Sequence, residues 1–305
     1  MAQYKHDRFF KLYIQSLYKT KGNTQQNIQV RNDEDLEIDL MFMGDRSNPG
    51  WEQEDLGLFD RLMEEWPTIV VEHYSSYLEA TDILKSITRK NLYWEPKQKE
   101  LVEAVKAEQN LTSSNRLSKE AMAQIENQNP FTWILTVNCS ENLLKLCGAQ
   151  PDPELGVGVY RLVRLLRMGI VVISKIADVP EAMWLKMLGG RESAQEAFGS
   201  LEQLSSDRRE KTDIMSTCKK YCVYLKELST TTPLTPEEQD LMRTMSQIDA
   251  WYETEMNNAE LKGEERRNKA IALNLLHKNF PLETIAEVTG LTIDQLEKLS
   301  SSPTE

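Results

Sequence analysis

The sequence predicts an α/β domain over residues 1–200, a helical connector over 201–265 and a small helical unit over 266–305. Apolar segments of strand length alternate with segments of helical periodicity through most of the first range, which is the pattern of an α/β domain. Beyond that range only helical periodicity is found. A chain of 305 residues is long enough to bury a sizeable core without disulfides or metals.

Four segments are predicted to be strands. Residues 36–44 alternate apolar side chains with others, so one face of this strand is expected in the core. Residues 68–74 are β-branched and apolar up to Glu72. Two further buried strands are predicted at 131–138 and 169–176.

Helices are predicted where apolar residues recur at helical spacing. An amphipathic helix is expected over 4–19, and the polar segment 21–27 is expected to be a break before the first strand. A helix over 76–94 is expected to end at Glu95-Pro96, because a proline disfavours the helical conformation of the residue before it. The other helices are expected over 57–66, 97–108, 141–149, 179–190, 192–229 and 235–276.

The C-terminal segment 279–299 has the spacing of a helix-turn-helix unit, with Gly290 in the turn. A helix that reads DNA needs basic or amide side chains near its N-terminal end. Here Asp294 and Glu297 would repel phosphate. We therefore expect this unit to mediate packing or homo-oligomerisation in preference to base recognition.

The charge of the chain limits its function. The formal net charge of −12 excludes a protein that coats DNA by bulk positive charge, but it allows a local basic cleft. Residues 1–31 contain six Lys or Arg against one Asp, whereas residues 33–65 contain twelve acidic residues against two Arg. The acidic block is expected to be a solvated loop, with a collection of metal-binding carboxylates as the alternative.

The apolar and cysteine patterns exclude several other classes. No apolar stretch reaches the length of a membrane span, so we expect no membrane partner and a cytoplasmic location. The four cysteines are too sparse for a disulfide framework and include no Cys-x-x-Cys pair, so buried thiols are expected and a zinc site is not.

Two acidic residues in strands are the candidates for chemistry. Asp39 lies inside one apolar strand and Glu72 closes another, and a carboxylate in such a place is costly unless it is solvated, paired or bound to a metal. If the two strands are neighbours, the two side chains can approach each other and share Mg²⁺ or Mn²⁺. Glu37 is a possible third ligand. The alternative is that the carboxylates are exposed on a half-solvated sheet.

The order of these segments resembles the PD-(D/E)XK phosphodiesterase superfamily. It is most similar to the recombination-promoting nuclease and putative transposase family, in the divergent form common among cyanobacterial proteins. The helical D..FK pattern of that family is matched by Asp7-Arg8-Phe9-Phe10-Lys11, its strand aspartate by Asp39, and its second motif begins at Glu72. The resemblance implies a restriction-endonuclease-like fold with a mixed central sheet, and a Mg²⁺-dependent or Mn²⁺-dependent DNA endonuclease linked to recombination or mobile DNA.

The resemblance also implies roles for individual residues. Asp39 and Glu72 would bind the metal and take part in catalysis, with Glu37 as a possible third ligand. The cationic residues expected to meet the phosphates of DNA are Arg8, Lys11 and Arg89.

The second motif departs from the family at Tyr74, where lysine or glutamine is expected. A neutral phenol cannot supply the positive charge of the family lysine, so Lys85 or Lys90 of the next helix would have to replace it. The alternative is a catalytically inactive scaffold that binds a protein or a nucleic acid. A structural protein without a nucleic acid partner is a third possibility, consistent with the net charge.

Overall fold

The computed structural model describes residues 3–30, 37–112, 115–189, 191–205, 208–234 and 236–301. The chain divides into two compact units, Met1–Ile248 and Asp249–Glu305. The first unit is an α/β domain with a mixed sheet, which confirms the predicted fold class at this level.

In the described part of the chain, the first unit contains a seven-stranded sheet with the order β1-β2-β3-β4-β7-β6-β5. Strands β3, β4 and β7 are parallel to one another, and the other pairs are antiparallel. The bounds are β1 (Gly22–Gln29), β2 (Glu37–Gly44), β3 (Thr68–Tyr77), β4 (Phe131–Asn138), β5 (Gln150–Pro151), β6 (Val159–Arg161) and β7 (Met168–Val172).

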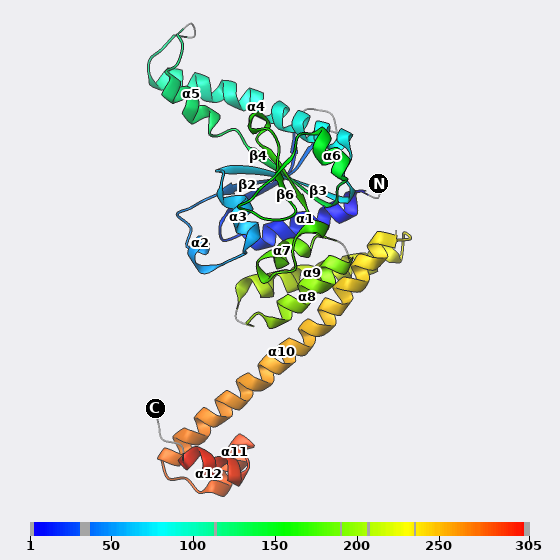
Figure 1. Cartoon of the computed structure of the whole chain (residues 1–305). Helices are drawn as coiled ribbons and strands as arrows, with labels where there is room; N and C mark the ends of the chain where they lie inside the picture. Colours follow the sequence, from blue (N-terminus) through cyan, green and yellow to red (C-terminus); the bar gives the residue numbers. More distant parts are fainter. Residues whose placement is uncertain are drawn as a thin grey trace. The chain divides into compact units, whose positions relative to one another are not determined.

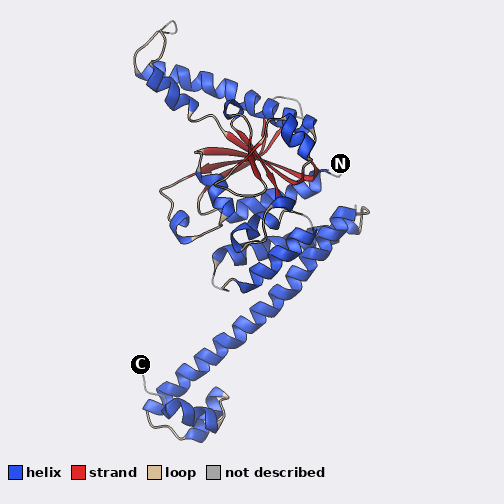
Figure 2. Ribbon diagram, viewed as in Figure 1, coloured by secondary structure: helices blue, strands red, loops and turns tan. Residues whose placement is uncertain are grey.

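Helices cover both faces of this sheet (Figures 1 and 2). Helices α4, α5 and α6 lie on one face, and α1, α3, α7, α8 and α9 lie on the other. The bounds are α1 (Gln3–Tyr18), α2 (Gly50–Gln53), α3 (Leu58–Glu64), α4 (Ala80–Glu108), α5 (Lys119–Glu126), α6 (Glu141–Leu146), α7 (Met183–Lys186), α8 (Arg191–Gln203) and α9 (Arg209–Ser229). Three short 3₁₀ helices are η1 (Arg164–Leu166), η2 (Ile173–Lys175) and η3 (Pro180–Ala182).

The core forms where apolar residues of the central strands meet these helices. Strand β7 is buried along its whole length and β4 along its first six residues, because helices cover both faces there. Trp133 is fully buried, and its indole nitrogen donates a hydrogen bond to the carbonyl oxygen of Leu62 at 2.8 Å. The apolar strands predicted from the sequence are therefore the strands of the core.

Several predictions about element boundaries were wrong: the strand expected over 169–176 ends at Val172, and the helix expected over 192–229 is divided into α8 and α9. Residues 21–27 were expected to be a break, but β1 occupies Gly22–Gln29 and pairs with β2 along its length. The helix expected to end before Pro96 continues through it, since α4 runs without interruption from Ala80 to Glu108. Pro96 lacks the N–H that would bond to a carbonyl one turn earlier, and the rest of α4 supports the helix despite this loss.

In the residues that the structure describes, 249–301, the second unit is built from helices and their connections. It contains the C-terminal part of α10 (Pro236–His277), then α11 (Leu282–Thr289) and α12 (Ile293–Ser301). Ala272, Ile285 and Leu296, one from each helix, form its fully buried core. Gly290 ends α11 in the left-handed conformation at φ 68°, as expected of a turn glycine. No described helix combines the length and the apolar character needed to cross a membrane.

Candidate functional site

Asp39 and Glu72 lie side by side on adjacent strands. The antiparallel register pairs Leu40 of β2 with Val71 of β3, and its continuation by one residue places Asp39 opposite Glu72. Glu72 is fully buried, whereas the side chain of Asp39 is 22% exposed. Burial, and next the negative charge of Asp39, raise the pKa of Glu72 well above its ordinary value. The two carboxyl groups are therefore within electrostatic reach of each other.

Two cations flank this acidic pair. Arg89 of α4 donates from Nη1 to Oε2 of Glu72 at 2.7 Å. Lys11 of α1 places its Nζ atom 3.8 Å from Oδ1 of Asp39, and donates to Oδ1 of Asn27 at 2.5 Å. Lys11 is itself only 6% exposed. The site, called here the charged row, is thus a pair of adjacent carboxylates with one cation on each side, in the order Lys11, Asp39, Glu72, Arg89.

The charges of the row are not fully satisfied. Oε1 of Glu72 and Nε of Arg89 are both buried without a hydrogen-bond partner among the described residues. A buried polar atom left without a partner normally costs 1 to 3 kcal/mol, so roughly that much is available to a ligand that supplies one. Oε1 is therefore the carboxylate oxygen of Glu72 that receives no hydrogen bond from the described residues.

Tyr74, two residues after Glu72, does not join this row. Its hydroxyl lies 3.3 Å from Oγ of Ser86 and 3.4 Å from the carbonyl oxygen of Asp82, both on α4. Burial, and next the charge of Glu72, raise the pKa of Tyr74, so its phenol stays neutral. Tyr74 therefore supplies no positive charge to the acidic pair.

The structure places the other cations of the sequence prediction elsewhere. Lys85 is exposed on the surface of α4. Lys90 is buried and donates to the carbonyl oxygen of Leu166, just before β7. The guanidinium of Arg8 is exposed and lies over the ring of Tyr224 in α9, 4.3 Å from its centroid. Of the predicted cationic residues, only Lys11 and Arg89 contact the acidic pair.

The described residues provide two carboxylates at this site. Glu37 is partly exposed at the start of β2, where it pairs with Gln29 of β1. Across the described part of the chain, no three or more His, Cys, Asp or Glu side chains form a group that could hold a metal ion. The side chain of Asp7, and residues 33–36 of the acidic block, lie outside the described residues.

The described part of the acidic block borders a cavity of about 360 Å³. Its lining includes Trp51 and seven charged residues, which are Glu52, Glu54, Asp55, Asp60, Arg61, Glu64 and Glu181. Beside it, the fully buried Lys21 donates to Oδ2 of Asp60 at 2.6 Å and to the carbonyl oxygen of Glu54 at 2.5 Å. These bonds explain why a lysine is buried here.

Asn27 is the residue of the site that sequence reasoning missed. The register of β1 against β2 places it opposite Asp39, in the left-handed conformation with φ 51°. Its amide oxygen holds Lys11 next to Asp39. No signal in the sequence could have found it, because β1 itself lacks the apolar alternation of a strand.

Comparison with family models, curated proteins and solved structures finds no match to this chain.

Proposed function

We propose that the chain is a divergent DNA endonuclease that hydrolyses phosphodiester bonds with Mg²⁺ or Mn²⁺, on a restriction-endonuclease-like fold. The observation that supports this most is the pairing of Asp39 and Glu72 on adjacent strands, which concentrates negative charge at one point. A nuclease of this kind is expected to act in recombination or in mobile DNA, as the motif order suggests.

The donor set fits a divalent ion. Mg²⁺ normally takes one or two protein carboxylates and completes its octahedron with water and phosphate oxygens. Oε1 of Glu72 lacks a hydrogen-bond partner, and Asp39 is partly exposed, so both can be ligands. When bound there, the ion would activate a water molecule and stabilise the leaving oxygen.

The residues around the pair would position these groups. Arg89 fixes the carboxylate of Glu72 through Oε2 and leaves Oε1 for the ion. Lys11 lies 3.8 Å from Asp39 and would meet the scissile phosphate in place of the missing motif lysine. Asn27 holds Lys11 in this position.

The test is the nicking of supercoiled plasmid in the presence of Mg²⁺ or Mn²⁺. We expect activity in the wild type and its loss, by about a hundredfold or more, in Asp39→Ala and Glu72→Gln. Glu103→Gln is the matched control, because Glu103 is exposed on α4. Absence of nicking in the wild type, or nicking that Asp39→Ala leaves unchanged, contradicts the proposal.

The second candidate is an inactive nuclease-like scaffold that binds a protein or nucleic acid. Tyr74 favours it, because its phenol is neutral and engaged with Ser86. The two candidates differ in their response to Mn²⁺. The endonuclease should gain thermal stability from the ion in the wild type and lose this gain in Asp39→Ala, whereas the scaffold should show no gain in either protein.

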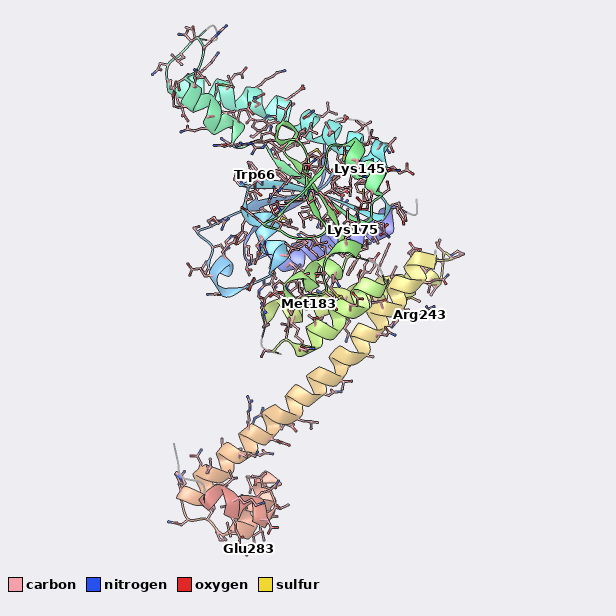
Figure 3. All side chains as sticks on the ribbon, viewed as in Figure 1. Trp66, Lys145, Lys175, Met183, Arg243 and Glu283 are labelled. Carbon is pink, nitrogen blue, oxygen red and sulfur yellow. The ribbon has the colours of Figure 1, made fainter. Side chains whose placement is uncertain are left out.

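We also propose that α11 and α12 mediate homo-oligomerisation. Val288 and Ile293 are exposed apolar side chains of these two helices. Light scattering should show a larger species for the wild type and a smaller one for Val288→Glu. The control is Glu283→Gln, since Glu283 is exposed on the same helix as Val288 (Figure 3). An unchanged mass for Val288→Glu would contradict this proposal.

A further inference from the structure

A cluster of buried polar atoms without hydrogen-bond partners surrounds the start of β4. Among the described residues, these atoms are Nε1 of Trp66, Oδ1 of Asn129, Oγ1 of Thr132, and Nε and Nη2 of Arg167. Buried polar atoms are normally paired, so several unpaired ones in one place indicate a missing ligand or missing water.

Contacts among these residues show that they form one cluster. The guanidinium of Arg167 lies over the ring of Trp66, 4.1 Å from its centroid. The carbonyl oxygen of Arg167 accepts a hydrogen bond from the backbone N–H of Thr132 at 2.9 Å. The carbonyl oxygen of Glu126 accepts from both Nη1 of Arg167 and the backbone N–H of Asn129, each at 3.1 Å.

A second buried cation lies next to Arg167. Lys90 is 4% exposed, and its ammonium group donates to the carbonyl oxygen of Leu166, the residue that precedes Arg167. Burial, and next the charge of Arg167, lower the pKa of Lys90 to about 8. Neither cation forms an ion pair with a carboxylate in the part of the chain that the structure describes. Glu126 lies within electrostatic reach of Arg167, so two cations meet one acid here and the local charge remains positive in an acidic protein.

We propose that Arg167 and Lys90 form a binding site for a phosphate group, distinct from the Asp39–Glu72 pair. Nε and Nη2 are the edge of a guanidinium that gives two parallel hydrogen bonds to an oxyanion. Nη1 is already bound to Glu126, which fixes the orientation of this edge. Lys90 adds a point charge, and the three donors together suit the several oxygens of a phosphate better than the two of a carboxylate.

The site lies at the surface of the first unit. Arg167 as a whole is partly exposed, and Arg164, in the same turn, is exposed. Binding as proposed requires that a phosphate enter from this side, since Nε and Nη2 of Arg167 are themselves buried. Burial lowers the pKa of Arg167, the negative charge of Glu126 opposes this, and Arg164 lowers the pKa further, so Arg164 adds to the positive potential along the entry while Glu126 reduces it.

The experiment titrates the full chain with inorganic phosphate at constant ionic strength, by calorimetry and by thermal shift. We expect saturable binding to the wild type, and a loss of affinity of about tenfold or more in Arg167→Gln and in Lys90→Met. Arg167→Lys should show an intermediate loss, because it keeps the charge but not the guanidinium edge. This conservative variant also serves if Arg167→Gln loses its folded circular dichroism spectrum.

Two controls match these variants. Arg46→Gln removes another arginine that lies over a tryptophan, 4.8 Å from the centroid of Trp51, but whose charge is compensated by Glu64. Lys145→Met removes an exposed lysine of α6, which lies well apart from Trp66 (Figure 3). Both controls should bind phosphate as the wild type does. Absence of phosphate binding by the wild type would overturn the proposal. So would a variant, Arg167→Gln or Arg167→Lys, that binds phosphate as tightly as the wild type does. Either result would indicate that water occupies the cluster.

A second titration identifies the source of the phosphate. If it belongs to a nucleic acid backbone, a single-stranded oligonucleotide should bind, compete with inorganic phosphate and lose affinity in Arg167→Gln. If it is a free phosphate, only the inorganic ion should depend on Arg167. Asp39→Ala should bind phosphate normally in both cases, so the outcome is independent of the nuclease proposal.

Discussion

Arg89 forms an ion pair with Glu72 in which Nη1 and Oε2 are 2.7 Å apart, although Glu72 is fully buried. We expect Arg89→Met to lower the free energy of unfolding by about 3 kcal/mol, since it leaves a buried carboxyl group without its cation. Urea unfolding followed by tryptophan fluorescence measures this loss. Lys85→Met is the control, because Lys85 is exposed on the same helix and should change stability by less than about 0.5 kcal/mol. Equal effects of the two substitutions would contradict the importance of the pair.

The lowered pKa of Lys90 predicts that the free energy of unfolding rises with pH. Its pKa of about 8 in the folded chain lies below the value of about 10.4 expected when unfolded, so the unfolded chain binds more protons between these values. The free energy of unfolding should therefore increase as the pH rises through this window, by an amount on the order of 3 kcal/mol. Buried thiols oppose this rise, because burial, and next Cys147, raise the pKa of Cys139 to about 11.

The contribution of Lys90 is isolated by comparing wild type with Lys90→Met. The difference between their free energies of unfolding should shift in favour of the wild type from about pH 7.5 to about pH 10. Lys145→Met, which removes an exposed lysine, should show no such shift. A constant difference across this range would show that Lys90 titrates normally.

Replacing Tyr74 by glutamine is expected to increase the proposed endonuclease activity. In the family that the motifs resemble, glutamine stands at this position, and its amide can donate to a phosphate or to water. We expect Tyr74→Gln to raise the rate of plasmid nicking by about tenfold or more, because a neutral phenol held by Ser86 makes no such contact. Tyr74→Phe is the control and should leave the rate unchanged. A rate in Tyr74→Gln no higher than in Tyr74→Phe would show that this position does not limit activity.

The sequence predicted the buried strands well, because their apolar patterns are set by local burial. Strands β2, β3, β4 and β7 all occur where alternation or β-branched residues placed them. Strand β1 escaped prediction because it lies at the edge of the sheet and its side chains are mostly polar. The end of a helix predicted at Pro96 was wrong, because the other residues of α4 stabilise the helix on both sides of the proline.

The candidate site was predictable only in part, because local sequence patterns indicate which residues are buried but not which residues they contact. Asp39 and Glu72 lie in apolar strands, where burying an unpaired carboxylate costs free energy, and this marked both as candidates. The adjacent strands β2 and β3 then bring them together. The partners of these acids depend on how helices pack on the sheet, which no spacing in the sequence reveals. Arg89, predicted to meet DNA, contacts Glu72, while Lys90, the next residue, donates to the carbonyl oxygen of Leu166.

Lys21 and Asp60 give the last prediction. Nζ of Lys21 lies 2.6 Å from Oδ2 of Asp60, and Lys21 is fully buried. Burial raises the pKa of Asp60, and Lys21 opposes this rise. We expect Lys21→Met to lower the free energy of unfolding by about 3 kcal/mol, because the buried carboxylate loses its cation.

A double substitution distinguishes a lost ion pair from lost packing. Asp60→Asn together with Lys21→Met should recover at least half of the stability, since no buried charge is then left alone. The control is Lys19→Met, whose surface pair with Asp213 at 2.7 Å should contribute less than about 1 kcal/mol. If Lys21→Met is no more damaging than Lys19→Met in urea unfolding, the buried pair does not hold this part of the domain. A double variant as unstable as Lys21→Met alone would instead assign the loss to packing of the lysine stem against Trp51, whose ring centroid is 5.0 Å from Nζ.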